Sequence, residues 1–378
     1  MTPFRVRIEA ADVDDLRDRL RRTRWPDAET DPSQGVPLAE LVDLCGYWAQ
    51  QYDPWRIERR LNIFPQELLD IGGTRLHVVH ARSADPAAVP LLLTHGWPGS
   101  VLEFLDVIGP LTAPDHGRAF HVICPSLPGY GFSPPPRETG WGIERIADAW
   151  AELMSALGYE RFLASGGDWG TSITTELALR HPARLLGIHL TPPLVAAGDP
   201  PWTAGEQEAV RLLEAAVDDG AGYTEQQRTR PQTLGYALTD SPAGQLAWIL
   251  ERFRSWVDTA GTGDLWSVLT RDQVLDDVTL YWLTRTAASS ARLYWESIGT
   301  VQQRLSSPPG PADLVRVPTA CSVFRDVPRP SRRWAERRFP DIRYFSEPVR
   351  GGHFAAMEQP GIFVDEVRAG FDAILGPP

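Results

Sequence analysis

We predict an α/β fold in which a mostly parallel sheet carries a helical insertion and is preceded by a helical segment. Between residues 71 and 192, short apolar runs alternate with stretches of helical periodicity, which is typical of parallel strands joined by right-handed crossovers. Residues 193–305 break this alternation with long helical patterns rich in Trp and Tyr, and strand-like runs return afterwards. The length of 378 residues, 43% of them hydrophobic, suits one large domain with insertions.

These patterns divide the chain into four expected parts. Residues 1–70 form a helical segment, because VDDLRDRL and PLAELVDLCGYW each place their apolar residues on one helical face. Residues 71–192 form the first part of the core, with strands expected in TRLHVVHA, VPLLLT and RFLASG. Residues 193–305 form a helical lid. After the breaker SSPPGP, residues 306–378 complete the core.

The bulk composition argues against several kinds of partner. The net charge of −12 disfavours nucleic acid or an anionic membrane. The charged N-terminus and the widely spaced Cys45, Cys124 and Cys321 indicate a cytoplasmic protein with reduced thiols. All 37 basic residues are Arg, which is typical of a GC-rich bacterial genome. The sequence has neither a metal-ligand signature nor a phosphate-binding loop, so we expect no metal and no cofactor.

The stretch LASGGDWGTS (163–172) has the form of a sharp turn between a strand and a helix. Such a turn usually presents a serine nucleophile, but its central position here is Asp168. An aspartate before a helix can also simply cap free backbone N–H groups. The flanking Gly166, Gly167 and Gly170 favour a strained, tightly packed elbow instead. We therefore interpret Asp168 as a nucleophile.

Two further candidates follow predicted strands, at the sheet edge where ligands gather. Asp326 and His353 come after Asp168 in the chain order nucleophile, acid, histidine. His353 follows a pair of glycines past the last predicted strand, and we interpret it as the base. The alternative is a loop histidine that caps the last helix. For His95, in the HGWP turn, we expect a structural hydrogen bond.

A carboxylate nucleophile selects a different chemistry from a serine. It attacks an sp³ carbon and forms an alkyl ester with the enzyme. Water activated by His353, itself held by Asp326, would then hydrolyse that ester. The backbone N–H groups of Trp97 and Trp169 would stabilise the oxyanion. The first step needs a good leaving group, which is either the strained oxygen of an epoxide or a halide.

Taken together, HGWPGS, GGDWG, RGGHFAAMEQP, RTRWP and the lid stretch TRPQTLGYALTDSPAGQLAWILERF resemble the microsomal-type epoxide hydrolases of the α/β-hydrolase superfamily. The resemblance implies that Asp168 is the nucleophile, His353 the base and Asp326 the acid, a position where the best-known animal members have Glu. It also implies that Tyr223 and Tyr294 protonate the epoxide oxygen. The family's HGxP turn further suggests a cis peptide bond between Trp97 and Pro98.

The resemblance favours an epoxide hydrolase that uses water to convert a small-molecule epoxide into a vicinal diol. The same core also serves haloalkane and haloacid dehalogenases, in which Trp97 and Trp169 could donate indole N–H groups to a halide. Two tyrosine hydroxyls favour the epoxide, because an alkoxide must gain a proton and a halide need not. A non-catalytic relative is disfavoured by the complete set of groups. We expect a bulky aromatic or secondary-metabolite epoxide, and the sequence leaves a homodimer open.

Overall fold

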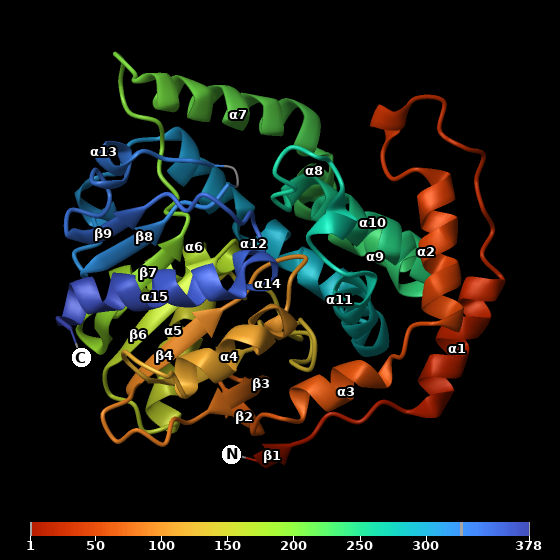
Figure 1. Ribbon diagram of the computed structural model, residues 1–378, viewed down its shortest axis with the longest axis horizontal. Coiled ribbons are helices and arrows are strands. Elements are labelled where there is room, and N and C mark those ends of the chain that lie inside the picture. Colours follow the sequence, from red (N-terminus) through yellow and green to blue (C-terminus); the bar gives the residue numbers. More distant parts are fainter. Residues whose placement is uncertain (1, 326–327, 378) are drawn as a thin grey trace.

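The computed structural model describes residues 2–325 and 328–377, without the side chains of residues 217–220. A sheet of nine strands runs through the described residues in the order β1-β2-β3-β5-β4-β6-β7-β8-β9 (Figure 1). Strands β4 to β9 run parallel to one another. Strands β1, β2 and β3 pair in succession in antiparallel fashion, and β3 also pairs antiparallel with β5. The predicted mostly parallel sheet is therefore confirmed. The strands are β1 (Thr2–Phe4), β2 (Gln66–Ile71), β3 (Thr74–Ala81), β4 (Val89–Thr94), β5 (Phe120–Pro125), β6 (Phe162–Gly167), β7 (Leu185–Thr191), β8 (Thr319–Ser322) and β9 (Ile342–Ser346).

Strands β1 and β2 lie within the N-terminal region, where the sequence suggested helices and loops. Strand β2 forms a hairpin with β3, and the turn consists of Gly72 and Gly73, which have φ values of 58° and 86°. A two-residue turn with positive φ at both positions matches the twist of a hairpin and favours glycine. The signal was thus present in the sequence, but QELLDI lacks the strict alternation of a half-buried strand.

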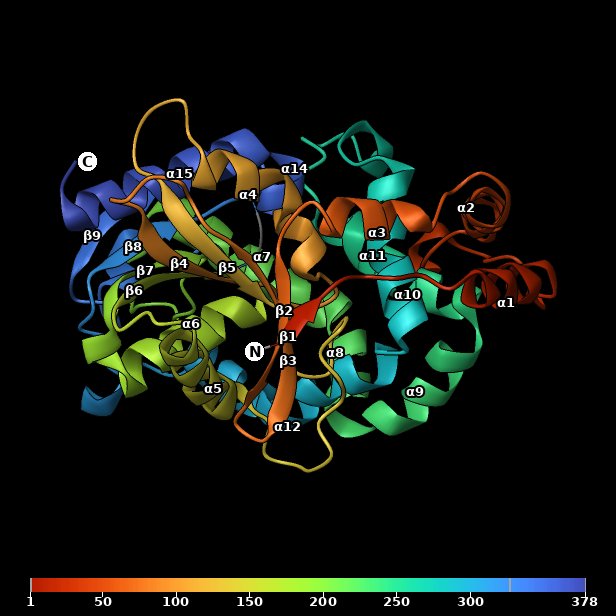
Figure 2. The same cartoon turned by 90° about the horizontal axis from the view of Figure 1, so that it is seen from below.

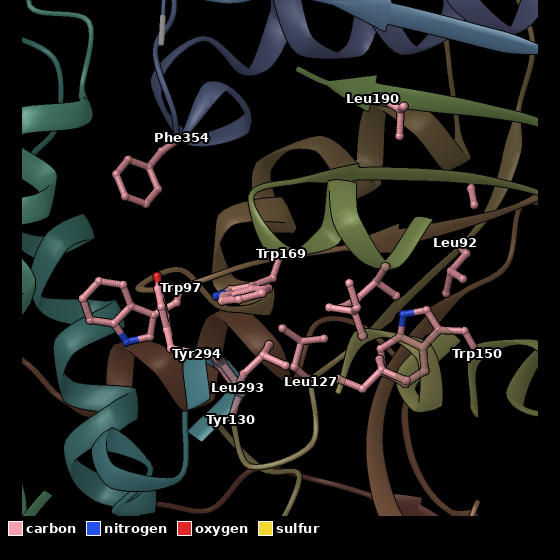
Figure 3. Packing of buried hydrophobic residues seen from close by; sticks show 14 of the residues in the cluster. Leu92, Trp97, Leu127, Tyr130, Trp150, Trp169, Leu190, Leu293, Tyr294 and Phe354 are labelled. Carbon is pink, nitrogen blue, oxygen red and sulfur yellow. The ribbon is translucent and has the colours of Figure 1, made fainter. Parts of the chain in front are cut away.

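Helices cover both faces of the sheet (Figures 1 and 2). On one face lie α4 (Leu105–Thr112) and α15 (Pro360–Leu375), and on the other lie α5 (Ile143–Ala156) and α6 (Trp169–Arg180). Side chains alternate along each strand, so Leu91 and Leu93 join the core under the first pair of helices, while Leu92 joins the core under the second pair. In this second core Trp150 packs close to Leu92 (Figure 3) and donates its indole N–H to Thr94 Oγ1 at 3.1 Å.

Helices α7 to α12, called here the inserted helices, lie between β7 and β8 in the chain. Helices α8 to α11 gather beyond the carboxyl ends of the parallel strands, and α12 runs back beneath the sheet (Figures 1 and 2). Among the described residues, no helix is both long and apolar enough to cross a membrane. The inserted helices are α7 (Ala204–Gly220), α8 (Gly222–Thr229), α9 (Pro231–Asp240), α10 (Pro242–Trp256), α11 (Arg271–Thr284) and α12 (Ala287–Ser306).

The N-terminal helices α1 (Ala10–Arg21), α2 (Leu38–Gln50) and α3 (Trp55–Leu61) pack against the inserted helices α10 and α11. Their apolar faces are those the periodicity predicted, with Val13, Leu16 and Leu20 buried in α1. Polar contacts add specificity, because the Tyr52 hydroxyl donates to the buried Asp276 in α11 at 2.7 Å. Two arginines of α3 also pair with Asp276.

Short elements complete the chain. The helices are α13 (Arg332–Ala335) and α14 (Ala355–Glu358). The 3-10 turns are η1 (Pro32–Gln34), η2 (Val101–Phe104), η3 (Pro182–Arg184), η4 (Leu265–Ser267) and η5 (Pro311–Asp313). Of these, η1, η2 and α14 contribute residues to the walls of two cavities near Asp168.

Candidate active site

Asp168 occupies the sharp turn between β6 and α6. Its backbone has φ 53° and ψ −125°, and its side chain makes no capping bond to α6. The capping alternative therefore fails, and the strained elbow is confirmed. The turn also requires its glycines: a Cβ on Gly166 would lie 2.2 Å from the Gly170 carbonyl oxygen, and one on Gly170 would lie 2.0 Å from the Thr94 carbonyl oxygen. A non-glycine residue with positive φ costs roughly 1–3 kcal/mol, so close packing on both sides must hold this turn.

The loop after β4 reaches the other side of the Asp168 carboxylate. The Trp97 backbone N–H donates to Asp168 Oδ1 at 2.8 Å, and the predicted cis peptide bond between Trp97 and Pro98 is present. Gly96 makes this approach possible, because a Cβ there would lie 2.0 Å from Asp168 Oδ1. The carboxylate is therefore held where a backbone donor can stabilise charge on one of its oxygens.

His95 has the structural role expected of it. Its Nε2 accepts the Leu127 backbone N–H at 3.1 Å, and its Nδ1 lies 3.0 Å from the Gly96 carbonyl oxygen. Because Nε2 accepts, the proton resides on Nδ1. Burial lowers the pKa of His95 to about 4, so the ring is neutral near pH 7 and supports the loop that carries Trp97.

His353 faces Asp168 from the loop after β9. Its Nε2 lies 3.5 Å from Asp168 Oδ2. The ring packs against Trp256, with ring centres 4.5 Å apart, and the His353 backbone N–H donates to the Trp256 carbonyl oxygen at 3.0 Å. Neither α14 nor α15 is capped by a side chain, so the alternative of a capping histidine fails.

Glu358 organises the loop that carries His353. Its carboxylate accepts the backbone N–H groups of Gly352 and Asp258 at 2.8 Å each, and that of Phe354 at 2.9 Å. A carboxylate that accepts several backbone N–H groups is strongly held. Since Asp258 follows the end of α10, Glu358 ties the His353 loop to the inserted helices.

Two tyrosines from the inserted helices meet above Asp168. Tyr223 in α8 stacks on Trp97 with ring centres 5.3 Å apart, and Tyr294 in α12 packs edge to face against Trp169 at 4.8 Å. The two tyrosine rings are 5.8 Å apart. Burial raises the pKa of Tyr223 to about 12 and that of Tyr294 well above its usual value, so both carry their protons near pH 7. Trp97, Trp169 and Tyr294 lie together in Figure 3.

Arg252 in α10 approaches the face of Tyr223. Its guanidinium carbon lies 4.8 Å from the Tyr223 ring centre and 5.6 Å from that of Trp256. The side chain is buried, with an exposed fraction of 6%, and forms an ion pair with Glu251. A cation at this distance favours the ionised form of Tyr223 and offsets part of the effect of burial on its pKa.

These groups surround one cavity of about 710 Å³, a volume in the usual range for a small-molecule site. Its wall combines apolar side chains near Asp168 with a polar and charged rim that includes the N-terminal turn η1. Within the described residues, no three His, Cys, Asp or Glu side chains group so as to hold a metal ion. The lining residues include Ser33, Gln34, Asp168, Trp169, Leu194, Tyr223, Glu251, Arg252, Arg254, Trp256, Tyr294, Ile298, Val301, Leu305 and His353.

Known proteins resemble this chain over nearly its whole length. The family model described as "Epoxide hydrolase N terminus" matches residues 1–104, and that of the "alpha/beta hydrolase fold" matches residues 89–271. A Stigmatella aurantiaca protein, provisionally named an epoxide hydrolase, is 50% identical over 98% of this chain and 84% of its own length. Epoxide hydrolase 1 of Sus scrofa is 32% identical over 97% of this chain and 87% of its own length. The chain belongs to the epoxide hydrolase family.

Solved structures of epoxide hydrolases share the fold. The juvenile hormone epoxide hydrolase of the silkworm Bombyx mori superposes with a TM-score of 0.89 at 29% identity, covering 99% of this chain and 94% of the other. The Aspergillus niger epoxide hydrolase superposes with a TM-score of 0.87 at 30% identity, covering 99% and 96%. The predicted α/β-hydrolase fold and the predicted resemblance to microsomal-type members are both confirmed.

The structure of this epoxide hydrolase gathers nearly all of the predicted site residues. Asp168, His353, Tyr223 and Tyr294 line the large cavity, and Trp97 and Trp169 flank Asp168. Asp326, the predicted acid, lies outside the described residues.

Four further residues of the site were not anticipated from the sequence: Glu103, Arg252, Trp256 and Glu358. Arg252 and Trp256 fall inside the lid stretch of the resemblance or directly after it, and Glu358 falls within RGGHFAAMEQP. Nothing in those motifs marks the residues as facing the site, because that depends on how α10 and α14 pack against it.

Proposed function

We propose that this epoxide hydrolase opens its substrate through a covalent ester on Asp168. The observation that carries the proposal is the placement of the two carboxylate oxygens. Oδ1 accepts the Trp97 N–H, and Oδ2 faces His353 at the floor of a cavity that also contains two protonated tyrosines. A nucleophile, a base and two acids thus converge on one substrate position.

In the first half-reaction, Asp168 Oδ2 attacks an epoxide carbon while Oδ1 remains in its hydrogen bond to Trp97. The carbon–oxygen bond of the ring breaks, and the leaving oxygen takes a proton from Tyr223 or Tyr294. The products are an alkyl ester, a free hydroxyl group and a tyrosinate. Arg252 lies against Tyr223, and its positive charge stabilises the tyrosinate at that position.

In the second half-reaction, His353 removes a proton from a water molecule that attacks the Asp168 carbonyl carbon. Negative charge develops on Oδ1 and is stabilised by the backbone N–H groups of Trp97 and Trp169. The ester bond to Oδ2 breaks, and His353 returns its proton to the departing alkoxide. The new Asp168 carboxylic acid loses a proton, which restores the tyrosine.

Two observations support a bulky epoxide as the substrate: the first concerns the leaving group and the second concerns size. The tyrosine hydroxyls favour an epoxide, because the alkoxide that it releases must gain a proton, whereas the halide of the dehalogenase alternative leaves without one. The cavity of about 710 Å³ accommodates a molecule of drug size. Activity toward a panel of aromatic, aliphatic and fused-ring epoxides, with a haloalkane as control, would test this substrate class.

Trapping the ester tests the two-step chemistry. In His353→Gln, the first half-reaction should proceed and the second should stop, so mass spectrometry should find an adduct of substrate mass on the peptide that contains Asp168. Asp168→Asn is the matched control and should give no adduct. Free diol formed by His353→Gln without any adduct would contradict the proposal.

Isotope labelling locates the attacking oxygen independently. A single turnover of the wild-type enzyme in ¹⁸O-water should give unlabelled diol, because the added oxygen comes from Asp168 Oδ2. The label should appear in the carboxylate of Asp168. Labelled diol after one turnover would instead indicate direct attack by water.

Asp326 remains our proposed acid partner of His353, on the basis of chain order and the family resemblance. Asp326→Asn should slow ester hydrolysis more than ester formation, since the partner stabilises His353 when it carries the extra proton. Equal slowing of both steps would contradict this role.

A further inference from the structure

A second, much smaller cavity lies next to the nucleophile. Its volume is about 30 Å³, and its wall includes Gly96, Glu103, Asp168 and His353. A buried water requires about 10–15 Å³ of such space and two to four polar partners. The cavity therefore has room for one or two water molecules and offers polar groups to bind them.

Asp168 and His353 line both the small cavity and the large one, whereas Tyr223 and Tyr294 line only the large cavity. The nucleophile and the base thus stand between the space for the substrate and a space too small for it. Once the ester has formed, the alkyl group occupies the large cavity. The small cavity then remains the place from which water can reach the carbonyl carbon.

Glu103 supplies the carboxyl group of the small cavity. It lies in η2, directly after the loop that carries Trp97, and Gly99 leaves room for it: a Cβ on Gly99 would lie 3.0 Å from Glu103 Oε2. Burial and then the nearby carboxyl of Asp277 raise the pKa of Glu103 well above its usual value. A protonated carboxyl group can both donate and accept a hydrogen bond, which suits it to orient a water molecule without competing with His353 for a proton.

We propose that the small cavity is the site of the hydrolytic water and that Glu103 is the residue that positions this water. The inference rests on the proposed ester mechanism and adds the source and orientation of the second reactant. The water oxygen forms the new bond to the Asp168 carbonyl carbon. One water hydrogen passes to His353 Nε2, and the other stays in a hydrogen bond to Glu103 until collapse of the intermediate leaves it on the Asp168 carboxyl group.

The proposal separates the two half-reactions. Ester formation uses groups of the large cavity and should be insensitive to Glu103, whereas ester hydrolysis should depend on it. A residue that merely supported the loop of Trp97 would affect both steps, because the Trp97 N–H contacts Asp168 throughout.

Glu103→Leu removes both polar atoms at similar size, and Glu103→Gln keeps one donor and one acceptor. Both variants should fold, since each keeps the approximate volume of the side chain, and volume-conserving replacements are tolerated best. With styrene oxide as the probe, rapid quenching and mass spectrometry would follow the ester on Asp168 through one turnover. In Glu103→Leu, hydrolysis should slow by at least tenfold, on the order of the cost of misplacing a reactant, while ester formation changes by less than about threefold. In Glu103→Gln, hydrolysis should return to within about threefold of wild type.

Asp277→Asn is the matched control. Asp277 is a buried acid near Glu103, and it accepts the Ser100 hydroxyl at 2.6 Å, but it does not line the small cavity. Both half-reactions should stay within about threefold of wild type in this variant, since an isosteric amide oxygen can accept the same hydrogen bond.

Several results would overturn the proposal. These are unchanged hydrolysis in Glu103→Leu, equal slowing of both steps, failure of Glu103→Gln to restore hydrolysis, or slowing in Asp277→Asn as large as that in Glu103→Leu. Failure of the ester mechanism itself would give a different result, because no adduct would then form on Asp168 even in His353→Gln.

Discussion

Gly96→Ala offers a sharp test of the geometry around Asp168, the proposed nucleophile. The added methyl carbon would lie 2.0 Å from Oδ1, 2.4 Å from Cβ and 2.5 Å from Cγ of Asp168. Protein Cβ atoms essentially never approach other heavy atoms more closely than about 3.0 Å. Either the Asp168 side chain or the loop after β4 must therefore move by about 1 Å, and either movement disrupts the 2.8 Å bond from the Trp97 N–H.

This displacement sets the expected magnitude. Misplacing a reacting group by about 1 Å can lower a rate by roughly 10²-fold, which corresponds to about 2.7 kcal/mol of transition-state stabilisation. The variant should still fold, because overpacking against a movable side chain costs about 1–3 kcal/mol, which is less than the roughly 5–15 kcal/mol by which domains are stable. We expect kcat/KM for diol formation to fall by at least about 10²-fold while the variant remains folded.

Two variants control for this interpretation. Gly46→Ala adds a methyl group in α2 where nothing lies within 4 Å, so activity should be unchanged and stability should rise by about 0.5–1 kcal/mol. In an Asp168→Gly background, which lacks the clashing atoms, Gly96→Ala should no longer destabilise the fold in urea titrations. Wild-type kcat/KM in Gly96→Ala, or a stability loss that persists in the Asp168→Gly background, would refute the reasoning.

Three other predictions concern charge. Arg252→Gln should slow ester formation about tenfold and Arg252→Lys much less, since a cation near an aromatic ring contributes up to about 2 kcal/mol. Equal slowing in both variants would show that the positive charge of Arg252 does not stabilise the Tyr223 tyrosinate. The free energy of unfolding of the wild type should fall as pH drops from about 6.5 toward 3. Burial lowers the pKa of His189 to about 3 in the folded protein, so in this range the histidine is protonated in the unfolded chain but not in the folded one. Each pH unit in this range should therefore remove about 1.4 kcal/mol of stability through His189. His189→Gln should show a shallower dependence, and an unchanged slope would refute the assignment. Asp276→Ala should destabilise the fold by about 3–5 kcal/mol, since it leaves two arginines and Tyr52 without their buried partner; a loss below about 1 kcal/mol in urea titrations would contradict this view.

The sequence alone determined the features that depend on local chain properties. The alternation of short apolar runs with helices predicted the parallel strands and the interrupting helices. The glycines around Asp168 predicted a strained elbow, because few other residues permit such close backbone packing. Chain order and the paired glycines distinguished His353 from the other histidines. Each of these inferences depends on residues that are near one another in the sequence or on the order of motifs.

Only the tertiary structure decided which distant residues meet. Tyr223 and Tyr294 could be singled out by resemblance, but their contact with each other and with Trp97 arises from the packing of α8 against α12. Likewise, nothing around Glu103 in the sequence indicates that its carboxyl group shares a cavity with Asp168 and His353. Burial then changes the chemistry of these groups, because removing a titratable group from water disfavours its charged form. Asp168 could therefore be singled out as the candidate nucleophile from its neighbours in the chain, whereas the meeting of the tyrosines, the proposed water site and the protonation states depend on three-dimensional packing.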